Sequence, residues 1–267
     1  MSSATAVIAV SVGMLPAFVV WLLVSGDARL EAAWLAPALP LVAVNVFANV
    51  LFLRAVTVSP LSLTIPLLAF TPVFAALLGL LFGDVPAPLQ WLGIVTVVAG
   101  ALALTAPEAE GRSLTGLAKA AWAQPGGRLM VVVAALWALA VVLDRESLAY
   151  ASIPMHAILQ VSGVAVVLAL VMAARGRAGD LRAMRGAKVL VVASGLAATV
   201  ALGAQLLALR QAPAGDVEAI KRAIGLAMAV AVGRLSFGEA IDAWRIAAVA
   251  LMGAGATAVV LGSGAGG

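Results

Sequence analysis

The stretch PLSLTIPLLAFTPVFAALLGLLF, residues 60–82, runs for 23 residues without a charged side chain. A helix needs about 20 mostly apolar residues to cross the hydrocarbon core of a bilayer, so this stretch predicts a membrane-spanning helix. Apolar and polar residues do not alternate along it, as they would in a strand of a membrane β-barrel. Pro66 and Pro72 interrupt the stretch, and such a break either borders a binding site or forms a packed kink.

The rest of the chain repeats this pattern. Hydrophobic residues make up 64% of the 267 residues and charged residues 10%, whereas soluble domains carry about 25% charge. The predicted fold class is therefore all-α, a polytopic transmembrane helix bundle of about nine spans with no soluble domain of any size. The apolar runs cover Ala4–Val24, Ala36–Thr57, Pro60–Phe82, Pro88–Thr105, Arg128–Leu143, Ile153–Ala174, Lys188–Leu209, Asp216–Leu235 and Ala240–Leu261.

Composition also excludes several functions. The chain has no Cys and one His, so we expect no cofactor, no metal site and no Cys nucleophile. The net charge of +4 comes mostly from loops between apolar runs, where it sets membrane orientation and does not indicate nucleic-acid binding. No G-x-x-x-x-G-K-[ST], G-x-S-x-G or H-E-x-x-H motif occurs, and the sequence favours a protein that is not an enzyme.

The N-terminal run is expected to be a retained span. No Lys or Arg precedes Arg29, whereas a signal peptide begins with a basic region. We therefore expect a multi-pass protein of the cell (inner) membrane whose surroundings are the lipid bilayer.

An internal repeat is visible in the order of three short motifs. Ala55-Val-Thr-Val-Ser-Pro60 is similar to Ala208-Leu-Arg-Gln-Ala-Pro213, and Phe82-Gly-Asp84 is similar to Phe237-Gly-Glu239. Gly100-Ala101 recurs as Gly255-Ala256, 155 residues later, and the two acidic residues share that offset. Tandem motifs of this kind are typical of transporters built from two repeats.

This motif order resembles that of the EamA-type permeases of the drug/metabolite transporter superfamily, through residues 59–104 and 219–260. The resemblance implies two repeats of inverted topology, which here would hold four and five helices because the first helix of the first repeat has no counterpart. The implied domains are a first repeat over residues 1–110, a connecting loop over 111–127 and a second repeat over 128–267.

The resemblance also implies a function, a secondary transporter (permease) that moves a small organic metabolite or drug across the membrane by alternating access. Its expected partners are a small-molecule solute, protons or a counter-solute, and a second copy of the chain in a homodimer. The alternative is a non-transporting membrane scaffold or subunit, packed through small-residue faces such as Gly79-x-x-x-Gly83. The sequence does not specify the solute.

The two arguments on orientation disagree. With nine spans, 11 Lys and Arg residues fall in loops on one side and three on the other, which predicts a cytoplasmic N-terminus and an external C-terminus. The ten-helix family implies that both ends are cytoplasmic. A reporter fused after Gly267 distinguishes the two orientations.

Charged residues within one predicted span are the first candidates for a site. Asp216, Glu218, Lys221 and Arg222 lie within seven residues, and their spacing places Glu218 on the same helical face as Lys221 and Arg222. Charges inside a membrane are costly, so we expect a substrate site with Lys221 or Arg222 as the cation. The alternative is an internal ion pair near the membrane surface.

Uncharged residues in other spans form a second set of candidates for substrate binding. Asn45 and Asn49 are spaced for one helical face, Gln160 and Gln205 are single amides, and Trp137 lies in mid-span. For the amides the alternative is hydrogen bonding between helices, and for Trp137 it is packing or lipid contact.

A third set lies near span ends. His156 could relay protons, although a lone His at an interface is more often solvated or bonded locally. Asp144 could be a coupling acid, or part of a terminal cluster with Arg145 and Glu146. Asp84 and Glu239 are expected to cap the helices that follow them.

Overall fold

The computed structural model describes residues 3–59, 64–105, 122–237 and 243–264. Most of these residues are helical, and their one pairing of extended backbone is an isolated bridge between Leu30 and Ala151. The expected all-α bundle is confirmed for the described residues. The longer helices are α1 (Ser3–Ser25), α2 (Leu35–Val58), α4 (Thr71–Gly79), α5 (Pro88–Thr105), α7 (Pro125–Ser147), α8 (Ile153–Ala174), α10 (Lys188–Leu209), α11 (Ala214–Phe237) and α12 (Ala243–Gly264).

Among the described residues, seven helical segments are long and apolar enough to cross a membrane, as expected of a membrane protein. Two expected spans fall outside this group: α5 has a shorter apolar stretch, and α11 carries five charged residues. The number nine therefore stays a prediction. The seven segments are Ala4–Ser25, Ala32–Val58, Ile65–Phe82, Pro125–Ser147, Ile153–Ala174, Lys188–Leu209 and Ala243–Ser263.

The chain divides into two compact units. Unit 1 contains residues 1–50 and 143–211, and unit 2 contains residues 51–142 and 212–267. Each unit takes one stretch from each half of the sequence, so the units differ from the repeats that the motifs predict. The repeat boundaries stay a prediction, and each unit is described below by itself.

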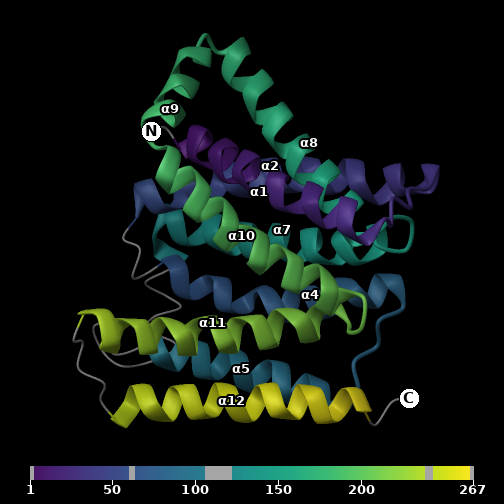
Figure 1. Ribbon diagram of the computed structural model, residues 1–267. Helices are drawn as coiled ribbons and strands as arrows, with labels where there is room; N and C mark the ends of the chain where they lie inside the picture. The colour runs from purple at the N-terminus through teal and green to yellow at the C-terminus, as the bar shows by residue number, and fades with distance from the viewer. Residues whose placement is uncertain (1–2, 60–63, 106–121, 238–242, 265–267) are drawn as a thin grey trace. The chain divides into compact units, whose positions relative to one another are not determined.

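In unit 1, α1 packs against both α8 and α10 (Figure 1). The contact with α10 is close because two glycines meet: a Cβ added at Gly195 would lie 2.5 Å from the carbonyl carbon of Gly13. The contact with α8 buries Ile8 among Val164, Leu168 and other apolar side chains of α8. Small residues thus let these backbones approach, as in other membrane helix pairs.

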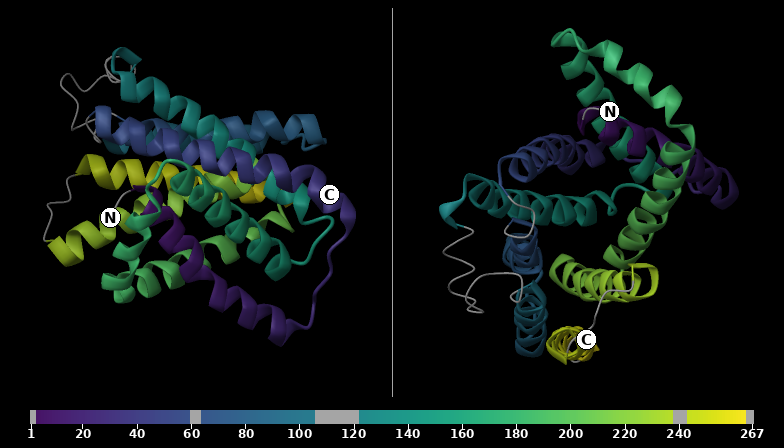
Figure 2. Two further views of the ribbon diagram at one scale, coloured as in Figure 1. Left: turned by 90° about the horizontal axis from the view of Figure 1, so that it is seen from above. Right: turned by 90° about the vertical axis from the view of Figure 1, so that its left-hand side faces the viewer.

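In unit 2, α5 and α12 lie side by side along most of their length (Figures 1 and 2). A Cβ at Gly255 would lie 2.8 Å from the carbonyl oxygen of Gly93, and one at Gly100 would lie 3.0 Å from that of Ala248. Helix α11 packs against α4, α5 and α12, and Ala219 and Ala223 contribute to their common apolar core.

The predicted span with Pro66 and Pro72 contains a break, which lies within unit 2. A 3₁₀ helix, η2, covers Ile65–Phe70, and α4 begins at Thr71. Pro72 has no N–H to donate to the carbonyl of Leu68, the bond that a continuous α-helix would make. The Thr71 hydroxyl donates to that carbonyl at 2.7 Å. The backbone N–H of Thr71 also donates to the Leu68 carbonyl, so Thr71 satisfies the group that Pro72 leaves free.

Candidate functional site

The first two turns of α11 carry the buried charges of unit 2. Asp216 and Glu218 are each 1% exposed. Asp216 lies in the first turn of the helix, where the helix dipole favours a negative charge. Three elements contribute to the surroundings of these acids and their neighbours: α11 itself, α5 and the η2–α4 break.

The Asp216 carboxylate has one side-chain partner. Gln90 on α5 accepts the N–H of Ala87 at 2.6 Å through Oε1, which leaves its Nε2 to donate to Oδ2 of Asp216. The other carboxylate oxygen, Oδ1, is buried and has no hydrogen-bond partner among the described residues. Because buried polar atoms are rarely left unpaired, this oxygen marks a position where a further donor would bind.

Lys221 forms an ion pair with Glu218, one turn earlier on α11. The Glu218 carboxylate is enclosed, whereas the Lys221 side chain is 45% exposed. This is the i,i+3 geometry that the sequence predicts, and it is compatible with both interpretations of the pair. A cation that is half accessible beside a buried acid could also contact a bound anion.

Arg222 lies next to the break in the preceding helix. Its Nη2 donates to Oγ1 of Thr71 at 3.4 Å, and the Thr71 hydroxyl uses its own proton for the Leu68 carbonyl. The Nε of Arg222 is buried without a partner among the described residues. Unit 2 therefore combines a broken helix, a guanidinium with an unused donor and a carboxylate with an unused acceptor.

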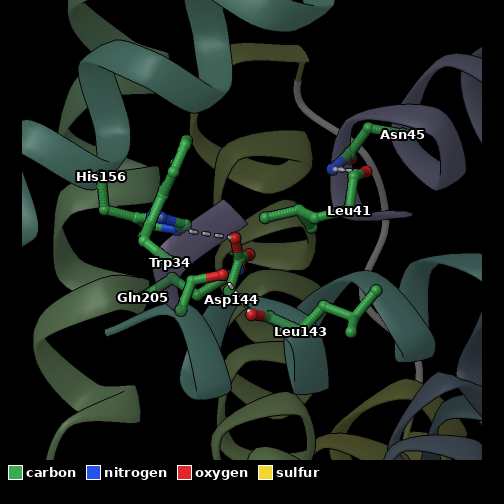
Figure 3. Close-up of polar contacts among 8 residues, drawn as sticks. Trp34, Leu41, Asn45, Leu143, Asp144, His156 and Gln205 are labelled. Atoms are coloured by element: carbon green, nitrogen blue, oxygen red, sulfur yellow. Dashed lines mark hydrogen bonds and ion pairs between the residues drawn. The ribbon is translucent and has the colours of Figure 1, made fainter. Parts of the chain in front are cut away.

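A separate polar chain lies in unit 1 (Figure 3). The indole Nε1 of Trp34 donates to Nδ1 of His156 at 3.0 Å, and Nε2 of His156 lies 3.1 Å from Oδ1 of Asp144. Gln205 on α10 donates to the second oxygen of Asp144 at 3.4 Å. His156 is 0% exposed and Asp144 is 2% exposed. The expectation that His156 is solvated or bonded only locally is therefore wrong, because its partners come from α7 and from the residue before α2.

The hydrogen-bond donors around His156 determine which nitrogen of its imidazole carries the proton. An indole nitrogen can only donate, so Nδ1 of His156 must accept and carries no proton. The proton of a neutral imidazole is then on Nε2, where it is donated to the Asp144 carboxylate. In this arrangement His156 is neutral and Asp144 carries the negative charge.

Two loops at this end of unit 1 hold each other through backbone contacts. The Arg29 guanidinium donates to the carbonyls of Leu148, Ala149 and Ala151. Ser152 donates to the carbonyl of Asp27 at 2.6 Å, and Leu30 pairs with Ala151. We call these contacts between residues 27–31 and 148–152 the loop clasp. It connects the chain that leads to Trp34 with the chain that leads into α8, the helix that carries His156.

A cavity of about 400 Å³ opens in unit 1. This volume is within the range of sites for small molecules. Its lining includes two guanidinium groups and one carboxylate, and two of these three residues directly follow Asp144 in the sequence. The lining residues are Arg145, Glu146, Leu148, Ala149 and Arg210.

The remaining predicted site residues are Asn45, Asn49, Trp137 and Gln160. Asn45 and Asn49 each donate to a carbonyl of their own helix, at 3.1 and 2.8 Å. Trp137 is half-buried with its ring centroid 5.2 Å from that of Phe52 in unit 2. Gln160 is buried one turn beyond His156 on α8, and its Oε1 has no partner among the described residues.

The two capping predictions, for Asp84 and Glu239, stay predictions. Asp84 follows Gly83, which has φ 86°, and its N–H bonds the carbonyl of Gly79, so its backbone closes the preceding helix. Its predicted role as a cap for the following helix stays a prediction, and Glu239 lies outside the described residues. Within the described ranges, no group of three or more His, Cys, Asp or Glu side chains could hold a metal ion.

Comparison with known proteins adds information on the fold alone. No protein-family model matches the sequence, and no curated protein matches it. One solved crystal structure, described only as that of a protein, is similar with a TM-score of 0.75 over 98% of this chain and 89% of the other. The two sequences are 15% identical.

Proposed function

We propose that this chain is a secondary transporter, an EamA-like permease that moves a small organic metabolite or drug across the cell inner membrane by alternating access. The observation that carries the proposal is the charged cluster at the start of α11. Two carboxylates are each 1% exposed there, in a chain whose helices are otherwise long and apolar. Ionisable groups are rare inside membrane helices, and where they occur they mark solute or ion pathways.

The hydrogen bonding of this cluster supports a binding role. Asp216 retains a free acceptor and Arg222 a free donor, both buried, among the described residues. A solute amino group would satisfy the Asp216 oxygen, and an acidic or amide oxygen would satisfy the Arg222 donor. Transporter sites are commonly placed beside broken helices, and the η2–α4 break at Thr71 lies within hydrogen-bond distance of Arg222.

The packing of α5 on α12 supports the repeat on which the family assignment depends. Gly100 and Gly255 occupy equivalent positions, 155 residues apart, and so do Gly93 and Ala248. Gly100 approaches Ala248, and Gly255 approaches Gly93. Exchanging the two halves of the sequence therefore converts one contact into the other. A two-fold relation between repeats produces this pattern, in agreement with the proposed arrangement of four plus five spans.

The test is solute flux into proteoliposomes that contain the full chain. We expect uptake above that of empty vesicles for at least one of a labelled amine, an amino acid and a nucleotide sugar. Glu218→Gln should lower the initial rate about tenfold, the effect of losing about 1.4 kcal/mol of transition-state stabilisation. Asp180→Asn is the matched control, since Asp180 is an exposed acid paired with Arg177. No uptake of any solute class would favour the alternative, a membrane scaffold or subunit.

A further inference from the structure

We infer that His156 and Asp144 form the binding site of one exchangeable proton, and that a proton on the imidazole releases Trp34. This inference rests on the proposed function and deepens it, because it names the proton as the coupling ion. The geometry that carries it is the chain of contacts from Trp34 through His156 to Asp144, at 3.0 and 3.1 Å.

The present arrangement has room for one more proton. With Nδ1 accepting from Trp34, the imidazole is neutral and the His156–Asp144 pair carries a charge of −1. A proton taken up from water brings the pair to zero net charge. If that proton adds to Nδ1, the ring becomes an imidazolium that still donates to Asp144 through Nε2. The pair then suits its apolar surroundings better, because its charges compensate each other.

The same proton is incompatible with the Trp34 contact. An imidazolium has an N–H at both nitrogens and the indole has an N–H as its sole polar group, so two donors would face each other over 3.0 Å. Trp34 must then move away. It precedes α2 directly, and it packs on Ala38 and Ala151. Loss of its hydrogen bond therefore loosens the start of α2 from α8 and from the residues of the loop clasp.

The size of the site selects a proton over a larger ligand. Both side chains are buried, and neither has the exposed surface that a solute would contact. Arg145, the residue after Asp144, lines the 400 Å³ cavity, so this cavity lies at the same end of α7 as Asp144. A proton needs no larger opening than a short path from that cavity.

The other charged groups at this end of unit 1 have roles of their own. Arg29 bonds three carbonyls of the loop clasp and lies 3.6 Å from Glu31. The Asp27 carboxylate accepts the Arg29 N–H. Arg145, Glu146 and Arg210 line the cavity, and Tyr150 packs near Trp34. Of the described titratable side chains, Asp144 is the one that bonds His156 directly.

The first test follows His156 itself, because the chain contains one histidine and so gives one imidazole signal. Full-length protein with ¹⁵N-labelled histidine is placed in lipid nanodiscs and titrated with acid. At neutral pH we expect the neutral ring with its proton on Nε2. At lower pH we expect an imidazolium, together with a change in one indole N–H signal. A ring that stays neutral throughout the pH range of the folded protein would overturn the inference.

Variants test the role of each partner. Trp34→Phe removes the opposing donor and Asp144→Asn removes the compensating charge, so each should change the proportion of imidazolium seen at a given acidic pH. Trp21→Phe is the control for the first variant, because Trp21 stacks on Phe18 and not on His156. A transition that is unchanged in Trp34→Phe would show that Trp34 does not respond to the proton.

The second test separates this inference from the proposed function. Vesicles with an internal pH dye are given each labelled solute, with and without a pH gradient. We expect the gradient to raise accumulation severalfold in the wild type and to have no effect in Asp144→Asn. Wild-type uptake that ignores the gradient would overturn proton coupling and leave transport standing. Absence of any uptake would instead contradict the proposed function. The histidine titration would still decide whether His156 takes up a proton.

Discussion

Asp144 in unit 1 accepts hydrogen bonds at both carboxylate oxygens, from His156 and from Gln205, whereas Asp216 in unit 2 accepts one from Gln90 and keeps Oδ1 unpaired among the described residues. Both acids are buried to the same degree, at 2% and 1% exposure. The difference is therefore in the partners and not in the surroundings. A carboxylate with both oxygens bonded is held as the anion beside an imidazole that can take the proton, and one with a free oxygen suits a ligand that brings its own donor.

Removing His156 from its contacts with Trp34 and Asp144 should have the largest effect on stability. His156→Leu leaves the Asp144 carboxylate and the Trp34 N–H buried without their main partner, and we expect a loss of about 3–5 kcal/mol in the free energy of unfolding. The measurement is the unfolding midpoint in detergent, followed by tryptophan fluorescence.

The double variant Asp144→Leu/His156→Leu is the control for this prediction. Replacing both partners by apolar side chains removes the uncompensated charge, so at least half of the lost stability should return. If the double variant is as unstable as the sum of its single variants, the two residues do not act as a pair and the comparison with Asp216 loses its basis.

A second prediction concerns packing, where the two units are expected to behave alike. Gly195→Ala in unit 1 and Gly255→Ala in unit 2 would each place a Cβ less than 3.0 Å from the backbone of a facing helix. We expect each to lower stability by about 1–3 kcal/mol, the usual cost of overpacking. Gly253→Ala is the matched control because a Cβ there meets nothing within 4 Å. A large effect in one unit alone would show that the units differ in more than their charges.

A third prediction concerns the sign of a single charge removal. Asp216→Asn keeps an oxygen for Gln90 and removes a buried charge that is incompletely bonded, so stability should rise by about 1 kcal/mol. Asp144→Asn weakens a charge-assisted bond to His156 and should lower stability by about 1–2 kcal/mol. Equal signs in the two variants, measured as shifts of the unfolding midpoint, would contradict the proposed contrast.

The parts of this structure that depend on local sequence could be predicted, and the parts that depend on long-range packing could not. The apolar runs Ile153–Ala174 and Lys188–Leu209 coincide with α8 and α10, because the length of an apolar run reflects the requirement of a membrane span. The shorter run Pro88–Thr105 coincides with α5. The Glu218–Lys221 pair follows from helical spacing within α11.

The hydrogen-bonded contacts of Trp34, His156 and Asp144 in unit 1 were not predictable in the same way. Trp34 and His156 are 122 residues apart, and nothing in their local sequence indicates that they meet. A weaker signal was present for Asp144 and His156. They lie on either side of the connection between α7, which ends at Ser147, and α8, which begins at Ile153, so they are close along the chain. The position of two polar residues on either side of a short connection between helices therefore indicates that they can contact each other.

The smallest effect is expected for Asn49, which the sequence placed among the candidate site residues. Its Nδ2 donates to the carbonyl of Asn45 in the same helix at 2.8 Å, a bond that joins no second element. Asn49→Ala should change stability by less than about 0.6 kcal/mol, the average for polar bonds in membrane helices, and solute flux by less than twofold. Both are measured in the assays above, with Gln205→Ala as the contrasting variant because Gln205 bonds Asp144 from another helix. If Asn49→Ala abolishes flux while Gln205→Ala does not, the Asn49 amide contacts the solute. The hydrogen bonds of Asp144 are then structural and do not take part in transport.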